Sequence, residues 1–279
     1  MQVILLGTGT PVLDANRQQS ALLVDIDGKK LLFDAGRGVT SQMARAGIQP
    51  QYIDAVFITH HHYDHISDLG EFLLTAWHNG RDTLINIFGP RGTAKIVATL
   101  LGEVFSRDIA FALFNDADAV DIRDLVQVTE VTSGWSQKSS GWKIHAQYVE
   151  HGNSLGLSQE QWPCLGYRLE SKKKVVAISG DTVACEGLDR LAHDADLLIQ
   201  CCYLAEDEII TPAAERQAKH VIASSGQVGK IATRNKVKKL ILTHIRPKSE
   251  AMMHALIEDV HNDYNGELII GEDLMVIDV

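Results

Sequence analysis

The chain has 279 residues, 45% of them hydrophobic, which is enough for one large α/β domain or two small ones. Its formal net charge of −10 and pI near 5.6 argue against a general nucleic-acid binder. No apolar run reaches about 18 residues, so no membrane-spanning helix is expected, and the first apolar run is too short for a signal peptide. The four cysteines form no Cys-x-x-Cys pair, so we expect free thiols and a cytoplasmic protein.

The first part of the chain alternates between short apolar runs and turns. Apolar, β-branched segments predict strands over 2–6, 21–27, 30–34 and 52–59. Helical spacing of apolar residues predicts helices over 39–46 and 68–77. The sequence from 59 to 65, which is rich in histidine, therefore lies where a strand ends and a helix begins. Open α/β sheets place their ligand sites outside the carboxyl ends of strands.

The segment Thr-His-His-His-Tyr-Asp-His, residues 59–65, carries four potential metal ligands, at His60, His62, Asp64 and His65. Residues two apart on extended backbone point to the same side, so His60 and His62 can hold one ion together. Asp64 and His65 fall where the chain turns and can reach a second ion close by. Imidazole and carboxylate suit zinc, with manganese or iron as alternatives. A polar, histidine-rich surface loop is the weaker interpretation, because four ligand-type residues fall within six positions.

The rest of the chain continues the alternation of helices and strands, with hairpins mixed in. Further strands are predicted over 84–88, 126–131, 142–149, 165–169, 174–178, 195–200, 237–243, 267–270 and 274–279. Further helices are predicted over 93–105, 188–192, 213–232 and 250–264. The stretch 109–125 gives no clear prediction, and 133–141 reads as a loop rich in turn residues. Because no linker divides the chain, we expect a single layered α/β domain with mixed sheets over residues 1–279.

Three further strand ends carry metal-type residues, namely His151, Asp181 and His244. Taken singly, either histidine would more often be structural, but together with the 59–65 segment they indicate a shared site. Seven ligands fit two ions that share one carboxylate. Asp34, at the end of the 30–34 strand, is either an ordinary strand-end carboxylate or a residue beneath the metal site that orients a ligand histidine.

The His-x-His-x-Asp-His motif resembles that of the metallo-β-lactamase fold superfamily. The fragments 6–11, 31–36, 179–182 and 242–247 are similar to the branch that holds ribonuclease Z and related arylsulfatases and phosphodiesterases. The resemblance implies a four-layer αββα sandwich of two similar halves, two zinc ions per chain and a possible homodimer. It implies one ion on His60, His62 and His151, a second on Asp64, His65 and His244, and Asp181 bridging both.

We therefore expect a dinuclear zinc-dependent hydrolase that uses a hydroxide between its ions to attack a small anionic ester, either a phosphodiester or a sulfate ester. Asp64 is expected to be catalytic as well as a ligand. His220 resembles an additional histidine of the branch and is a candidate proton donor; alternatively, it caps a neighbour on its helix. Arg246 is a candidate for binding a substrate oxyanion, with an ordinary surface arginine as the alternative.

Two other functions stay open. One is a ribonuclease Z-type endonuclease that processes the 3′ end of tRNA. That reading is disfavoured because the segment between His151 and Asp181 is too short for a protruding tRNA-gripping arm, and because the chain is acidic. We therefore do not expect tRNA as a partner. The other is a metal-binding protein without turnover, which is disfavoured because the full ligand set is present.

Overall fold

Strand β1 (Gln2–Gly7) shows how the sequence builds the layers. Its side chains alternate between two hydrophobic cores: Val3 and Leu5 belong to one cluster of buried residues, and Ile4 and Leu6 belong to another. A strand buried on both faces reads as an unbroken apolar run, as this one does. The first sheet therefore has an apolar layer on each side.

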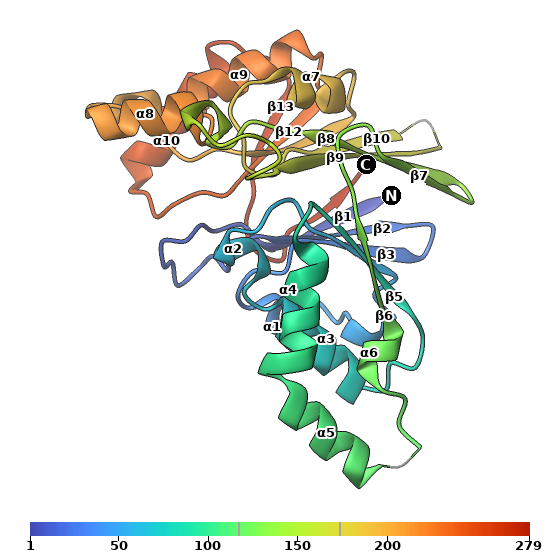
Figure 1. Cartoon of the computed structure of the whole chain (residues 1–279). Coiled ribbons are helices and arrows are strands. Elements are labelled where there is room, and N and C mark those ends of the chain that lie inside the picture. The colour runs from blue at the N-terminus through green and yellow to red at the C-terminus, as the bar shows by residue number, and fades with distance from the viewer. Residues whose placement is uncertain (117, 173) are drawn as a thin grey trace.

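The computed structural model describes residues 1–116, 118–172 and 174–279, and the strands in these ranges form two seven-stranded sheets packed face to face (Figure 1). The first sheet has the order β14 (Val276–Asp278), β1, β2 (Ala21–Ile26), β3 (Lys29–Phe33), β4 (Ala55–Phe57), β5 (Ile85–Gly89) and β6 (Val126–Glu130). The second has the order β13 (Glu267–Ile270), β12 (Lys239–Thr243), β11 (Leu197–Cys201), β10 (Lys174–Ile178), β9 (Leu165–Ser171), β8 (Trp142–Tyr148) and β7 (Ser136–Ser139).

The two sheets repeat one pattern of strand pairing. Strands from β14 to β3 pair antiparallel and those from β3 to β6 pair parallel. In the second sheet, strands from β13 to β10 pair parallel and those from β10 to β7 pair antiparallel. Both sheets are therefore mixed, and the predicted resemblance between two halves is present in the strand pairing. The C-terminal strand β14 pairs with β1, which joins the two ends of the chain in one sheet.

Helices cover both outer faces of the paired sheets (Figure 1). On the first sheet lie α1 (Val39–Arg45), α3 (Leu69–His78), α4 (Thr93–Thr99), α5 (Ser106–Asn115) and α6 (Ile122–Leu125). On the second lie α7 (Glu186–Ala192), α9 (Ser225–Arg234) and α10 (Glu250–His261), with α8 (Pro212–His220) projecting beside them, while the short α2 (Tyr63–Ile66) lies at the edge of the first sheet. The predicted four-layer αββα sandwich is thus confirmed. No helix in the described ranges combines the length and apolarity needed to span a membrane.

A group of aromatic side chains fills the space between the two sheets. Phe57 stacks between Phe33 and Phe88, with ring centroids 5.0 Å apart in each pair, and Tyr167 meets Phe33 and Phe57 edge-on. The Tyr167 hydroxyl, which is fully buried, donates a 2.7 Å hydrogen bond to the Ile58 carbonyl. This bond joins the second sheet to the segment that follows β4, one residue before Thr59.

Several elements differ from the sequence prediction. The strand expected over 52–59 is limited to β4, because Pro50–Tyr52 forms a 3-10 turn. The helix expected over 93–105 changes to a π-helical turn at Leu100–Val104. The undecided stretch 109–125, of which residue 117 lies outside the described part, includes most of α5 and all of α6. The long helix expected over 213–232 is divided into α8 and α9, and the break falls at 221–224.

The bond between Tyr167 and Ile58 leads to a stability prediction. Tyr167→Phe should lower the free energy of unfolding by about 1–3 kcal/mol, because the buried Ile58 carbonyl loses its donor. Tyr52→Phe is the matched control, since Tyr52 is 67% exposed, and it should change the value by less than about 0.5 kcal/mol. Urea denaturation followed by circular dichroism measures both. Equal midpoints for the two variants would contradict the assigned bond.

Candidate metal centre

The candidate ligands lie beyond the C-terminal ends of strands from both sheets. His60, His151 and Asp181 each come three residues after a strand, namely β4, β8 and β10, and His244 directly follows β12. His62 precedes α2, and Asp64 and His65 lie within it. Because parallel strands end at a common edge, ligands far apart in sequence converge there.

The backbone at this edge adopts conformations that side chains disfavour. Asp34 and His244 have φ values of +58° and +55°, in the left-handed region. Such strain persists only where the surroundings enforce it, and it is concentrated at functional sites. Gly180, just before Asp181, has φ +60°, and a Cβ there would lie 2.6 Å from the Leu165 carbonyl oxygen. Only glycine lets the loop of Asp181 approach the neighbouring strand so closely.

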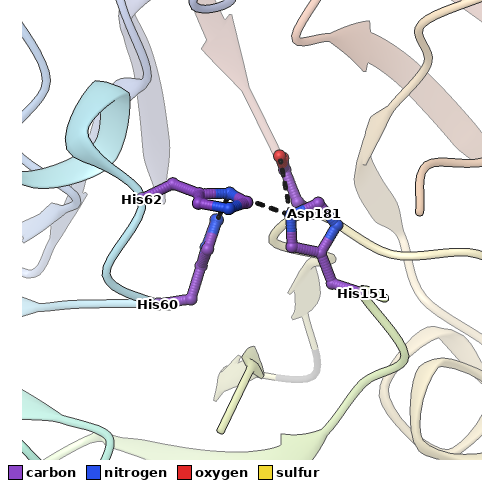
Figure 2. Close-up of side chains that lie close together, drawn as sticks. All are labelled: His60, His62, His151 and Asp181. Carbon is purple, nitrogen blue, oxygen red and sulfur yellow. Dashed lines mark hydrogen bonds and ion pairs between the residues drawn. The ribbon is translucent and has the colours of Figure 1, made fainter. Parts of the chain in front are cut away.

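One group of ligand atoms comes from His60, His62, His151 and Asp181, whose ligand atoms all lie within 4.8 Å of one another. Figure 2 shows these side chains pointing toward a common point. His62 Nδ1 lies 3.0 Å from His60 Nε2 and 3.0 Å from His151 Nε2. Two nitrogens bound to one tetrahedral zinc ion at 2.0–2.1 Å would lie about 3.3 Å apart, so the spacing fits a shared ion.

A second group comes from Asp64, His65 and His244. His244 Nε2 lies 3.1 Å from Asp64 Oδ2, and His65 Nε2 lies 3.6 Å from the same oxygen. Asp181 Oδ2 lies 3.2 Å from His244 Nε2, 3.6 Å from His65 Nε2 and 3.8 Å from His151 Nε2. One carboxylate oxygen therefore lies beside both groups.

Neighbouring acceptors fix the proton on three of the imidazoles. Thr59 Oγ1 donates its only hydrogen to Asp34 Oδ2, so it must accept from His60 Nδ1. His151 Nδ1 donates to the Val221 carbonyl over 2.6 Å, and His65 Nδ1 donates to Asp34 Oδ2 over 2.7 Å. Each of these rings therefore directs Nε2 at the site, and Nε2 is the nitrogen that can bind a metal once it carries no proton.

The electrostatic setting keeps most of the imidazoles neutral. Burial lowers the pKa of His60 and His151, and burial together with the nearby His151 lowers the pKa of His62 to about 4. For His65, burial alone would lower the pKa, but the carboxylates of Asp181 and Asp34 raise it well above the usual value. That ring keeps a second proton, which a bound cation would replace.

The two carboxylates of the site are ionised at neutral pH. Burial alone would raise the pKa of Asp181, but His244 and His65 hold it well below the usual value. Burial likewise opposes ionisation of Asp64, but the hydrogen bond from His244 and the charge of His65 lower its pKa. Two carboxylates and five imidazoles thus gather at one site, where His62 is exposed to solvent and the other six side chains are buried.

Unpaired polar atoms test whether this donor set fits metal ions. His65 Nε2 and Asp64 Oδ1 are buried and have no hydrogen-bond partner among the described residues. Such atoms cost free energy unless something binds them, and metal ions are a natural partner for imidazole and carboxylate. With the preset tautomers, these atoms show that the residues fit divalent cations.

The other predicted site residues also have clear positions. His220 Nδ1 lies 2.8 Å from Ser154 Oγ, and its carbonyl accepts from Gly152 N, next to His151. The Arg246 guanidinium forms an ion pair with Glu208 and lies over the Tyr203 ring, 5.6 Å from its centroid. The structure therefore places His220 against the His151 loop and Arg246 against a carboxylate of its own chain.

Sequence reasoning missed two supporting residues. Thr59 bridges Asp34 and His60, and its position directly before the motif was the available signal. Trp162 packs its ring 4.8 Å from that of His62 and donates through Nε1 to the His151 carbonyl. No sequence pattern marks Trp162, because its role arises from the return of the 153–163 loop over the ligands.

Comparison with known proteins gives consistent results. The family model described as "Beta-lactamase superfamily domain" matches residues 29–245. Ribonuclease Z of Mycobacterium bovis (strain BCG / Pasteur 1173P2) is 31% identical over 289 positions, which cover 100% of this chain and 98% of that protein. Ribonuclease Z of Mycobacterium sp. (strain KMS) is 33% identical, with 100% and 96% covered.

Solved structures show the same fold. Human tRNase Z, short form, has a TM-score of 0.74 and 22% identity, and the match covers 100% of this chain and 99% of that one. The metallo-beta-lactamase fold protein YhfI from Bacillus subtilis has a TM-score of 0.74 and 19% identity, with 99% and 98% covered. At these identities the structural likeness concerns the fold alone.

The contact between Asp34 and His65 leads to a prediction about metal affinity. Asp34→Asn should weaken zinc binding by about 10- to 100-fold, because the amide orients His65 less well and no longer counters its charge. Asparagine tolerates the left-handed backbone, so the fold should be kept. Competition with a chromogenic chelator measures the affinity. Asp54→Asn, at the opposite end of the neighbouring strand, is the control; an equal loss there would contradict the role of Asp34.

Proposed function

The chain belongs to the metallo-β-lactamase fold superfamily, in its ribonuclease Z branch, and on this premise we propose that it is an endonuclease that removes the 3′ extension of precursor tRNA. At the coarser level it is a metal-dependent hydrolase acting on ester bonds. The observation that carries the proposal is the match to proteins named Ribonuclease Z over the full length of both chains.

Two expectations from the sequence are wrong. The substrate was expected to be a small anionic ester, and tRNA was not expected as a partner, but the full-length relatives are named Ribonuclease Z. The absent arm was a poor guide, because an alignment of 289 positions covering 98% of the Mycobacterium bovis protein leaves that relative no room for a long extra arm either. Net charge was also misleading, because it is a sum over the whole chain and RNA contacts a local surface.

We propose that the site holds two divalent ions, with zinc as the expected metal. One ion would be held by His60, His62 and His151, the other by Asp64, His65 and His244, and Asp181 would bridge them. The position of Asp181 Oδ2, 3.2 Å from His244 Nε2 and 3.8 Å from His151 Nε2, supports the bridging assignment. When bound, such ions supply a hydroxide nucleophile at neutral pH and neutralise charge that develops on phosphoryl oxygens.

The side chains then have separate tasks. Asp64 and Asp181, ionised and buried, hold negative charge at the site so that it attracts cations and keeps them. His220, beside the His151 loop, would donate a proton to the ribose oxygen that leaves when the phosphodiester bond breaks. Arg246 would contact a phosphate oxygen; its Nε has no partner among the described residues, while Glu208 holds another part of its guanidinium.

The proposed activity has a direct test. Purified zinc-loaded protein should cleave a transcript of tRNA with a short 3′ extension and release the extension as one fragment, as resolved on a denaturing gel. Removal of metal by a chelator should abolish cleavage, and added zinc should restore it. An intact transcript in the presence of bound zinc would contradict the proposal.

The variant Asp181→Ala serves as the inactive control in that cleavage assay. It should remove cleavage and reduce the bound zinc, measured by elemental analysis, because both groups of ligands lose a shared oxygen. Unchanged zinc stoichiometry would contradict the bridging assignment even if cleavage were lost.

His220 is tested separately from the metals. His220→Ala should lower kcat for the transcript by about 10²- to 10⁴-fold while the zinc content stays unchanged, because a general acid acts on the leaving group and not on the ions. His254→Ala is the control, since His254 is an exposed helix histidine. A parallel fall in zinc content would show instead that His220 supports the His151 loop.

A further inference from the structure

Helix α8 extends outward beside the metal centre and has little contact with the core (Figure 1). Of its nine residues, only Ala218 is buried. Its C-terminal end is attached to the site: the His220 carbonyl accepts from Gly152 N over 2.7 Å, and the Val221 carbonyl accepts from His151 Nδ1 over 2.6 Å. The helix therefore begins in solvent and ends against a candidate metal ligand.

The exposed side of α8 carries two basic residues, Arg216 and Lys219, and one acidic residue, Glu215. Arg216 and Lys219 are exposed, and neither has an ion pair or hydrogen bond through its side chain to the residues that the structure describes. Two other cations near the site, Arg246 and Lys248, both pair with Glu208. In a chain with a net charge of −10, two unpaired cations beside the active site form a distinct local surface.

The spacing of these side chains places them on one face of the helix. Arg216, Lys219 and His220 stand at positions i, i+3 and i+4, which are neighbours on a helix surface. Arg216 lies about 6 Å from His220 along the helix axis. The acidic residue of the helix, Glu215, is also exposed; it is adjacent to Arg216 and stands four residues before Lys219, so the three side chains together carry one net positive charge. The face of α8 that carries Arg216, Lys219 and His220 therefore extends from His220, beside the site, toward the solvent-exposed end of the helix.

We propose that this face of α8 binds the RNA backbone, with Arg216 and Lys219 pairing with phosphates of the strand that leaves the metal centre. The inference rests on the proposed function, since it names the surface that holds the precursor tRNA. This proposal also explains how an acidic chain without a long arm would hold RNA. The positive charges of Arg216 and Lys219 act locally, and α8 projects from the body of the protein. Phosphate contacts by lysine and arginine supply most of the affinity in such complexes and weaken with salt.

A simpler explanation of the two cations is local. Basic residues near a helix C-terminus interact favourably with the helix dipole. That explanation predicts a small loss of thermal stability on their removal and no effect on RNA. The two explanations therefore differ in what they predict for salt dependence and for the KM of the RNA substrate.

The test uses the zinc-loaded full chain with the double substitution R216Q/K219Q, which leaves His220 in place. At about 50 mM salt, the KM for precursor tRNA should rise about tenfold with little change in kcat. The slope of log(kcat/KM) against log[salt] should become shallower by about 1.4–1.8, which corresponds to two lost phosphate contacts. Hydrolysis of bis-p-nitrophenyl phosphate, which is too small to span α8, serves as the reference rate.

The control is R107Q/K138Q, which removes the same charge from exposed positions on α5 and β7, away from the metal centre. Its KM and salt slope should match those of the wild type. An unchanged KM for R216Q/K219Q, or a rise equal to that of the control, would overturn the inference while wild-type cleavage left the proposed function standing. Wild-type protein that leaves precursor tRNA intact would overturn both.

Discussion

The hydrogen bonds of the segment Ile58-Thr59 hold together the parts of the two sheets that carry the candidate metal ligands. The Ile58 carbonyl accepts from the Tyr167 hydroxyl, and the Thr59 carbonyl accepts from Leu165 N, so both bonds tie it to strand β9 of the opposite sheet. The Thr59 amide and hydroxyl both donate to Asp34, at the end of the neighbouring strand β3. A single short segment therefore sets the distance between the two sheets where their ligands meet.

The same segment, together with Asp34, determines which ring nitrogen of His60 and His65 faces the site. Asp34 accepts the hydroxyl hydrogen of Thr59, so Thr59 Oγ1 can only accept from His60 Nδ1. Asp34 also accepts from His65 Nδ1. Both imidazoles therefore direct Nε2 at the site. Val221 performs this task for His151 from the break between α8 and α9. The ligands are thus oriented before any cation binds, so binding carries a smaller entropic cost for ordering these side chains.

The acidity of the chain is compatible with the proposed RNA binding because charge acts locally. Carboxylates such as Asp64 and Asp181 are buried at the centre, where they attract cations, and Glu208 pairs with both Arg246 and Lys248 close by, which leaves one positive charge in that group. The proposed RNA-binding residues, Arg216 and Lys219, belong to α8, which projects from the body of the protein (Figure 1). The net charge is a sum over all these groups, so it predicts neither the candidate metal site nor the proposed RNA surface.

The sequence by itself determined the motif at residues 59–65, most of the strands and a layered α/β domain with mixed sheets, because hydrophobic periodicity and ligand spacing are local properties. The αββα architecture was predicted from the resemblance of the motif to a known superfamily. The sequence did not determine β7, whose exposed polar residues carry no strand pattern, or the division of 213–232 into two helices. Only the tertiary structure decided that Val221 orients His151 and that Glu208 holds Arg246. These contacts join residues 70 and 38 positions apart, and their formation depends on sheet register and loop paths, which no local pattern encodes.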